Sequence, residues 1–125
     1  FYSRNKAVSH LNRGKVTIFG CGMGNPFFST DTAAVLRGAE IGADVVLMAK
    51  NIDAIYTDDP RKNPDAKKLS EVDYDYILKN HLSAIDTCAA SFAMDNHMKL
   101  HIFGLDDSEN IYRVIMGEKI GTIVD

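Results

Sequence analysis

The residue types best suited to binding chemistry gather in one short stretch, Gly20 to Asp31, which reads GCGMGNPFFSTD. Its three alternating glycines let the backbone turn where a side chain would clash. Pro26 fixes its own φ and biases Asn25 towards extended geometry, so the turn is stiff as well as tight. A glycine loop between a strand and a helix start leaves backbone N–H groups free to bind an anion. The residues alone leave two interpretations open, an anion site and an ordinary structural turn.

Two familiar phosphate motifs are excluded. A dinucleotide fingerprint starting at Gly20 needs a third glycine at position 25, which is Asn25. A Walker A loop needs Gly-Lys-Ser/Thr, and Gly14-Lys15 is followed by Val16. Any phosphate bound here must therefore be held by a different loop. Cys21 lies in the loop without a His or basic neighbour in sequence, which disfavours a nucleophilic role.

A second polar stretch, Lys50 to Pro60, carries acidic, amide and aromatic side chains close together. It follows an apolar run, Ala43 to Ala49, that is typical of a buried strand of a parallel sheet. If that strand is parallel to the short apolar run before the glycine loop, both loops leave the carboxyl edge of the sheet, where ligands of open α/β sheets bind. The alternative is an exposed, turn-rich connection.

Composition limits the class of protein. A chain of 125 residues with 46% hydrophobic and 25% charged residues is typical of one globular domain. The net charge of −3 and the scattered basic residues give no reason to expect a nucleic-acid partner. No apolar run is long enough to span a membrane, and no signal peptide is visible.

Cys21 and Cys88 are expected to be reduced thiols of a cytoplasmic protein. His97 and His101 straddle a helix–strand junction, so no metal site is expected.

The first half of the chain predicts helix, strand, helix and strand. Residues 1–12 are interpreted as the end of a helix with no visible start, as in a piece of a longer protein. A strand is expected over Lys15–Phe19 and a helix over 30–42, with Ser29 or Thr30 as N-cap and Gly42 as C-cap. With the strand at 43–49, these form a right-handed parallel unit.

The second half continues the α/β pattern. A weak capping box over Ser70–Asp73 starts one helix, and a second helix should bury one face. A strand is expected over 98–103, a helix begins after Asp106 and Asp107, and a terminal strand covers 120–124. The expected faces of these helices carry Tyr74, Ile77 and Leu78; Leu82, Ile85, Ala89 and Phe92; and Ile111, Val114 and Ile115.

Several motifs resemble the amino-acid kinase superfamily in type and order. They are Asp31-Thr32-Ala33-Ala34, then Ala43-Asp44 before the buried strand, then the run from Asp53 to Arg61. The loop Gly24–Asp31 is similar to the G-N-P-F-F-T-T-D loop of the bacterial uridylate (UMP) kinase branch, and Met116–Ile123 is similar to the C-terminus of that branch. The resemblance covers essentially the whole chain.

The resemblance implies a three-layer αβα sandwich with a largely parallel central sheet, of which residues 1–125 are the carboxy-terminal, nucleotide-binding half. It implies phosphorylation of UMP by ATP with Mg²⁺, in a homo-oligomer that is hexameric in the family. The implied UMP site is Met23, Gly24, Asn25, Pro26, Phe27, Phe28, Ser29 and Thr30, with Phe28 bordering the uracil or ribose. Asn51, Tyr56 and Asp59 match the ATP site, and Asp31 matches a catalytic acid.

The chain departs from the family pattern at three positions. Met23 stands where Thr is common, Ala54 where Gly is frequent and Asp58 where Ala is frequent, and the match around Lys50-Asn51 is ambiguous by one residue. The lysine and glycine-rich loops that hold the transferring phosphate lie in the other half of the family's domain. The isolated chain is therefore expected to transfer no phosphate.

Two alternatives stay open at this stage. The superfamily pattern alone permits a half of a related kinase that acts on aspartate, glutamate or carbamate. The second alternative is a non-catalytic nucleotide-binding module that kept the fold without the lysine loops. Competition between UMP and those acids for binding would distinguish a UMP kinase from the related kinases. A reading frame that encodes no upstream half would favour the non-catalytic module.

Overall fold

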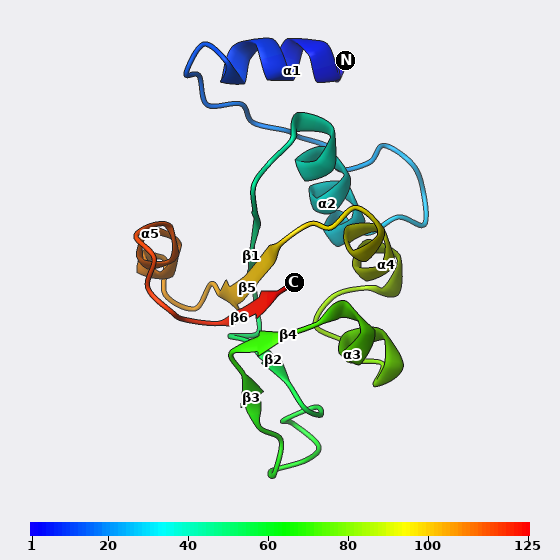
Figure 1. Ribbon diagram of the computed structural model, residues 1–125, viewed down its shortest axis with the longest axis vertical. Helices are drawn as coiled ribbons and strands as arrows, with labels where there is room; N and C mark the ends of the chain where they lie inside the picture. The colour runs from blue at the N-terminus through cyan, green and yellow to red at the C-terminus, as the bar shows by residue number, and fades with distance from the viewer.

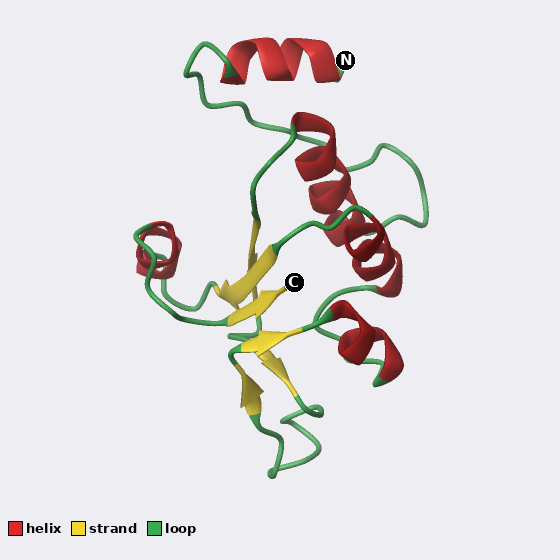
Figure 2. Cartoon of the chain, in the orientation of Figure 1, coloured by secondary structure: helices red, strands yellow, loops and turns green.

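The computed structural model describes all 125 residues, which form five helices and six short strands (Figures 1 and 2). None of the helices combines the length and apolar character needed to cross a membrane. The helices are α1 (Arg4–Leu11), α2 (Thr30–Ile41), α3 (Tyr74–Lys79), α4 (Thr87–Asp95) and α5 (Glu109–Ile115). The strands are β1 (Val46–Lys50), β2 (Ile55–Tyr56), β3 (Lys68–Leu69), β4 (Glu71–Val72), β5 (Leu100–Gly104) and β6 (Thr122–Val124).

The main sheet has four strands in the order β1-β5-β6-β4. β1 is parallel to β5 and β4 is parallel to β6, whereas β5 and β6 are antiparallel. The sheet is therefore mixed but mostly parallel. A separate antiparallel pair, β2 and β3, forms a short hairpin beyond the sheet.

Helices cover both faces of the sheet, with α2, α3 and α4 on one side and α5 on the other (Figure 1). The division follows the alternation of side chains along β5. Leu100 and Ile102 belong to the cluster that also contains residues of α2, α3 and α4, whereas Phe103 lies outside it. The expected three-layer α/β arrangement is confirmed.

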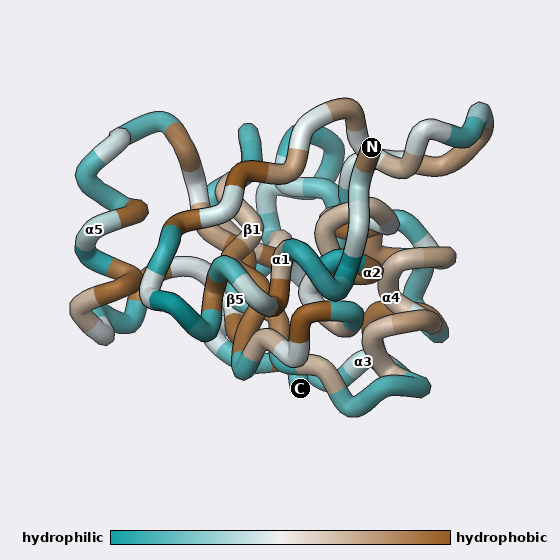
Figure 3. Tube along the Cα trace, turned by 90° about the horizontal axis from the view of Figure 1, so that it is seen from above, coloured by the Kyte–Doolittle hydropathy of each residue, from teal (hydrophilic) through white to brown (hydrophobic).

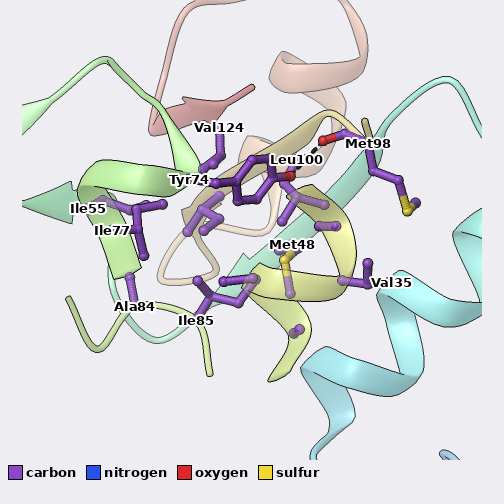
Figure 4. Packing of buried hydrophobic residues seen from close by; sticks show 14 residues of the cluster. Val35, Met48, Ile55, Tyr74, Ile77, Ala84, Ile85, Met98, Leu100 and Val124 are labelled. Carbon is purple, nitrogen blue, oxygen red and sulfur yellow. Dashed lines mark hydrogen bonds between the residues drawn. The ribbon is translucent and has the colours of Figure 1, made fainter. Parts of the chain in front are cut away.

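The core consists mainly of aliphatic side chains from strands, helices and the turn before α4 (Figure 4). Tyr74 is buried in it and donates its hydroxyl to the backbone oxygen of Met98 at 2.6 Å. Burial raises the pKa of the Tyr74 phenol, with the charge of Asp125 adding to the effect. Gly38 lets α2 approach the sheet, because a Cβ there would lie 2.6 Å from Val46 Cγ2.

The predicted limits of α2 are confirmed. The Ser29 hydroxyl accepts a hydrogen bond from the Thr32 N–H at 3.1 Å, and Gly42 ends the helix in the left-handed conformation with φ 69°. Asp31 lies in the first turn, at the positive end of the helix dipole.

The strand expected over Lys15–Phe19 is absent. The stretch is irregular and pairs with no other segment of the chain, so the parallel unit predicted around it does not form. The apolar run at 43–49 does form a strand, but β1 begins only at Val46. It is not buried on both faces, because Leu47 is 37% exposed and Ala49 is also exposed.

Other boundaries also differ from the sequence-based expectations. α1 has a visible start, since the Ser3 hydroxyl accepts from the Lys6 N–H. The N-cap of α3 is Asp73, and the predicted box fails because β4 occupies residues 71–72. Leu82 and Ile85 precede α4, whose N-cap is Asp86, so they pack from a turn rather than a helix face.

Candidate functional site

The three residues assigned to ATP lie together. Asn51, Tyr56 and Asp59 line one cavity of about 800 Å³, between the β2–β3 hairpin segment and residues 80–84. The residues that the family resemblance assigns to ATP therefore share one concave surface, and their binding roles stay a prediction.

Tyr56 is held in place by an acid. Its hydroxyl donates to Asp53 Oδ1 at 2.9 Å, and Lys68 Nζ lies 3.0 Å from Asp53 Oδ2. The hydrogen bond to Asp53 raises the pKa of the Tyr56 phenol. Burial raises the pKa of Asp53, but the hydrogen bonds from Lys68 and Tyr56 outweigh it and leave that pKa below its ordinary value. Asp53 therefore stays ionised and orients the aromatic ring at the cavity wall.

Asp59 shapes the turn that closes the cavity. Its Oδ1 accepts from the Arg61 N–H at 3.0 Å, and its backbone oxygen accepts from two further N–H groups. Asp58, one of the departures from the family pattern, accepts from the Asp59 N–H at 2.7 Å and from Asn63 Nδ2 at 3.0 Å. The hydrogen bond from Asn63 is the main cause that lowers the Asp58 pKa. The substitution at position 58 thus adds hydrogen bonds within the loop.

The hairpin is fastened to the main sheet through a buried threonine. The Ile55 N–H donates to Thr122 Oγ1 at 2.8 Å, and the same hydroxyl donates to the backbone oxygen of Leu69 at 2.5 Å. Both strands of the hairpin are therefore fixed to β6 by one side chain. Sequence reasoning missed the hairpin because each strand has only two residues.

The start of α2 is joined to the start of α4. The hydroxyls of Ser29 and Thr32 both donate to the carboxylate of Asp86, which also accepts from the Ala89 N–H at 2.9 Å. Burial raises the pKa of Asp86, but the hydrogen bonds from Ser29, from the Ala89 backbone and from Thr32 dominate and lower it. One ionised carboxylate therefore fixes the two helix N-termini relative to each other.

Asp31, the candidate catalytic acid, forms an ion pair with Lys50. Lys50 Nζ lies 2.5 Å from Asp31 Oδ2 and donates to the backbone oxygen of Ala84 at 2.7 Å. Both side chains are about one-fifth exposed. The end of β1 thus meets the start of α2, although the strand expected before the glycine loop is absent.

Lys50 is a site residue that sequence reasoning did not assign. Its ammonium group lies beside the first turn of α2, where it is paired with the Asp31 carboxylate. Its place at the end of an apolar strand was the available signal, since ligand-binding residues follow the carboxyl ends of parallel strands. Asp31 and Lys50 line a groove of about 490 Å³ that reaches Asn51.

Unlike the residues assigned to ATP, the residues assigned to UMP do not share a cavity. Residues 23–29 line none of the principal cavities, although Thr30 borders the groove beside Asp31. Phe27 is fully exposed and Phe28 is 50% exposed. The chain alone therefore does not fold this stretch into a pocket, and the binding roles of these residues stay a prediction.

The glycine loop has unusual backbone geometry. Gly22 and Gly24 have φ of 57° and 73°, as their residue type allows, and the non-glycine residues Cys21 and Phe27 have φ of 68° and 69°. L-residues rarely adopt this region, and strain of this kind gathers at ligand sites. No hydrogen bond within the chain holds residues 16–28.

No cluster of three or more His, Cys, Asp or Glu side chains is arranged to hold a metal ion. Cys21 and Cys88 are both free and exposed.

The chain was compared with known proteins. Residues 2–104 match the amino acid kinase family. The UMP kinase of Bacillus anthracis is 34% identical and superposes with a TM-score of 0.92, covering 99% of this chain and 51% of that one. The UMP kinase of Ureaplasma parvum is 32% identical with a TM-score of 0.90, covering 99% of this chain and 53% of that one. The uridylate kinase of Archaeoglobus fulgidus is 28% identical with a TM-score of 0.69, covering 81% of this chain and 49% of that one.

The chain spans about half the length of these kinases. The family match extends over most of the chain and includes the glycine loop, α2, β1 and the hairpin. This chain therefore belongs to the amino acid kinase family.

Proposed function

We propose that this chain is the carboxy-terminal, nucleotide-binding half of an ATP-dependent UMP kinase, with the UMP site at residues 23–30 and ATP beside Asn51, Tyr56 and Asp59. The observation that carries the proposal is the superposition of 99% of the chain on a UMP kinase at 34% identity. The family pattern shared with kinases of aspartate, glutamate or carbamate would permit another acceptor. The solved structures that the chain resembles are kinases of a uridine nucleotide.

The cavity beside the hairpin fits a nucleoside triphosphate in size and chemistry. Its volume of about 800 Å³ lies within the 300–1,000 Å³ typical of small-molecule sites. Tyr56 supplies an aromatic face for a base, and Asn51 supplies an amide that can both donate and accept hydrogen bonds. Stacking and paired hydrogen bonding of this kind would suit a purine base.

The acceptor side rests on the start of α2. The free N–H groups of the glycine loop and the dipole of α2 favour a phosphate beside Ser29 and Thr30. Lys50 lies next to this helix start and would add positive charge, which phosphoryl transfer mainly requires of a protein. Asp31 would hold Lys50 in position.

Bound Mg²⁺ would neutralise charge on the phosphates of ATP, the chemistry that it supplies generally in phosphoryl transfer. The carboxylates of this chain do not form a cage for it, since Asp31 is paired with Lys50 and no group of three acids converges. A magnesium ion held mainly by phosphate oxygens and water fits this arrangement.

The two-site assignment is tested by nucleotide binding to the purified chain, measured by calorimetry with ATP and UMP separately. Base–aromatic stacking contributes about 1–3 kcal/mol, so Tyr56→Ala should weaken ATP binding by roughly tenfold. UMP binding should not change. Tyr56→Phe is the matched control, because it keeps the ring and removes only the hydrogen bond to Asp53.

An equal loss of affinity for both nucleotides, or no ATP binding by the folded wild-type chain, would contradict the assignment of Tyr56. Competition for the UMP site by aspartate, glutamate or carbamate would favour the related kinases over a UMP kinase.

A further inference from the structure

Three hollows of the chain meet at one turn. They are the cavity of about 800 Å³ beside the hairpin, the groove of about 490 Å³ at Asp31 and Lys50, and a groove of about 440 Å³ lined by residues of α3 and α4. Ser83 is the one residue that lines all three. It lies in the connection between α3 and α4, and these two helices lie beside α2 and away from α5 (Figures 1 and 3).

The turn Ser83–Ile85 has three unpaired backbone donors. The N–H groups of Ser83, Ala84 and Ile85 make no hydrogen bond to the backbone, and no side chain accepts from them. Ala84 and Ile85 are only 7% and 4% exposed, and each lines at least one of the hollows. Because N–H groups of buried residues are nearly always paired, these donors indicate an acceptor from outside the chain. Successive N–H groups in a turn commonly bind anions such as phosphate.

Two side chains add further donors at the same turn. Ser83 is exposed, and no group of the chain bonds to its hydroxyl. The backbone oxygen of Ala84 accepts from Lys50 Nζ at 2.7 Å, so the ammonium group lies against the turn. An ammonium group has three donor hydrogens, and Asp31 and the Ala84 oxygen take two of them. A hydroxyl and one ammonium hydrogen are therefore available beside the three N–H groups.

The carboxylates that face the two grooves near the turn are already engaged. Asp31 is paired with Lys50, and Asp86 accepts hydrogen bonds from the hydroxyls of Ser29 and Thr32. An engaged carboxylate repels a bound anion less than a free one does, because its charge is partly compensated. The turn can therefore bind an anion even though two acids lie close to it.

The place of the turn indicates which anion fits. The cavity beside the hairpin and the groove at Lys50 share a border made of Asn51, Ile52, Ser83 and Ala84. A nucleotide with its base beside Tyr56 would extend its phosphates across such a border to reach the groove. Ser83 is one of only two polar side chains on this border.

We propose that the turn Ser83–Ile85 binds the phosphate chain of the donor nucleotide where it passes from the cavity beside the hairpin to the groove at Lys50. The Ser83 hydroxyl and the N–H groups of the turn donate to phosphate oxygens. The side chain at position 83 thereby sets how strongly a polyphosphate is preferred over an uncharged nucleoside. The identity of the nucleotide rests on the proposed function, whereas the anion site depends only on the turn.

The first experiment titrates the purified chain with inorganic triphosphate and follows the backbone amides by NMR. Inorganic triphosphate has no base, so it tests the anion site without the cavity at Tyr56. The amide signals of Ser83, Ala84 and Ile85 should shift progressively and reach a plateau. The amide of Ile102, in the buried strand β5, is the internal reference and should not shift.

The second experiment measures the affinities of ATP, inorganic triphosphate and adenosine by calorimetry. Ser83→Ala should weaken the binding of ATP and triphosphate by about 3- to 10-fold, the effect of one lost hydrogen bond. Ser83→Asp places a negative charge against the phosphates and should weaken both by roughly tenfold or more. Adenosine is uncharged, so its affinity should not change in either variant.

Ser108→Asp is the matched control for the added charge. Ser108 is also exposed, lines none of the three hollows and makes no capping hydrogen bond with its side chain. Its substitution should leave all three affinities unchanged.

Three results would overturn the inference. They are unshifted amides at Ser83–Ile85, equal triphosphate affinity of Ser83→Asp and the wild type, and an equal loss of ATP and adenosine affinity in Ser83→Asp. The last result would mean that Ser83 contacts the nucleoside. Failure of the proposed function has a different signature. If triphosphate shifts the turn amides but neither ATP nor adenosine perturbs Tyr56, the anion site stands and the assignment of the ATP cavity is wrong.

Discussion

The hairpin segment Ile55–Leu69 is held by hydrogen bonds along its length, whereas the stretch from Val16 to Phe28 is held by none. In the hairpin, the Thr57 N–H donates to the Lys67 oxygen at 2.9 Å, and the Lys67 N–H donates to the Thr57 hydroxyl at 3.0 Å. Both regions are rich in turn residues, but only the hairpin segment lines the cavity that contains Asn51, Tyr56 and Asp59.

The difference shows which part of the site the chain builds by itself. The hairpin finds its partners within 20 residues and in β6, so its cavity is already shaped for a ligand. The glycine stretch has suitable conformations but lacks partners for its backbone groups. Its order must come from a ligand or from further polypeptide, because unpaired backbone groups gain little from a fixed position.

The largest expected difference in stability is between alanine substitutions at two glycines, one in the sheet region and one in the glycine loop. Gly121→Ala should lower the free energy of unfolding by roughly 2–5 kcal/mol, since φ is 77° and a Cβ would collide with the Ile102 oxygen and lie 2.9 Å from Phe103 Cβ. Gly24 has φ of 73° but nothing within 4 Å of a Cβ, so Gly24→Ala should cost less than about 1 kcal/mol in a loop free to relax. Urea denaturation measures both. Similar losses would mean that the glycine loop is as constrained as the sheet.

The anchoring of the hairpin is tested by Thr122→Val. The change removes a fully buried hydroxyl and leaves the Ile55 N–H and the Leu69 oxygen without partners, which should cost roughly 1–3 kcal/mol for each group. Thr57→Val is the control in the same hairpin, because the hydrogen bond that it removes is exposed. Its effect should stay below about 1 kcal/mol. Equal effects would indicate that the hairpin does not depend on β6.

The smallest expected effect is the pH dependence of stability that arises from Asp86, which accepts hydrogen bonds from Ser29 and Thr32 at the end of the glycine loop. The pKa of Asp86 is lowered in the folded chain, so its contribution to stability is complete above the unfolded pKa of about 3.9 and is lost as pH falls through the folded value. Because the carboxylate is partly exposed, the effect should be below about 1 kcal/mol. Asp86→Asn keeps an N-cap for α4 and should flatten the loss of stability between pH 5 and pH 3 in acid denaturation. An unchanged acid profile would show that Asp86 does not link α2 to α4 electrostatically.

Much of the framework could be predicted from residues close in sequence. The limits of α2 followed from Ser29 and Gly42, because a helix cap is a contact across three or four residues. The hairpin and the start of α4 were missed, since two-residue strands leave no periodic pattern and Leu82 mimics helical spacing from a turn.

The candidate site was also predictable only in part. The glycine loop and the polar stretch after β1 were identified from residue types, and Asn51, Tyr56 and Asp59 do share one cavity. The pairing of Asp31 with Lys50 was not foreseen, because it joins two elements that are 19 residues apart.

The sequence by itself determined the caps of α2, the two polar loops and the family, since these depend on local chemistry and on motifs. Only the tertiary structure decided whether an apolar run becomes a paired strand. Ala43 to Ala49 and Lys15 to Phe19 are both apolar enough, but only the first includes a strand, β1, because β5 offers it backbone partners. A strand exists through hydrogen bonds to another segment, and no propensity of its own residues can supply them.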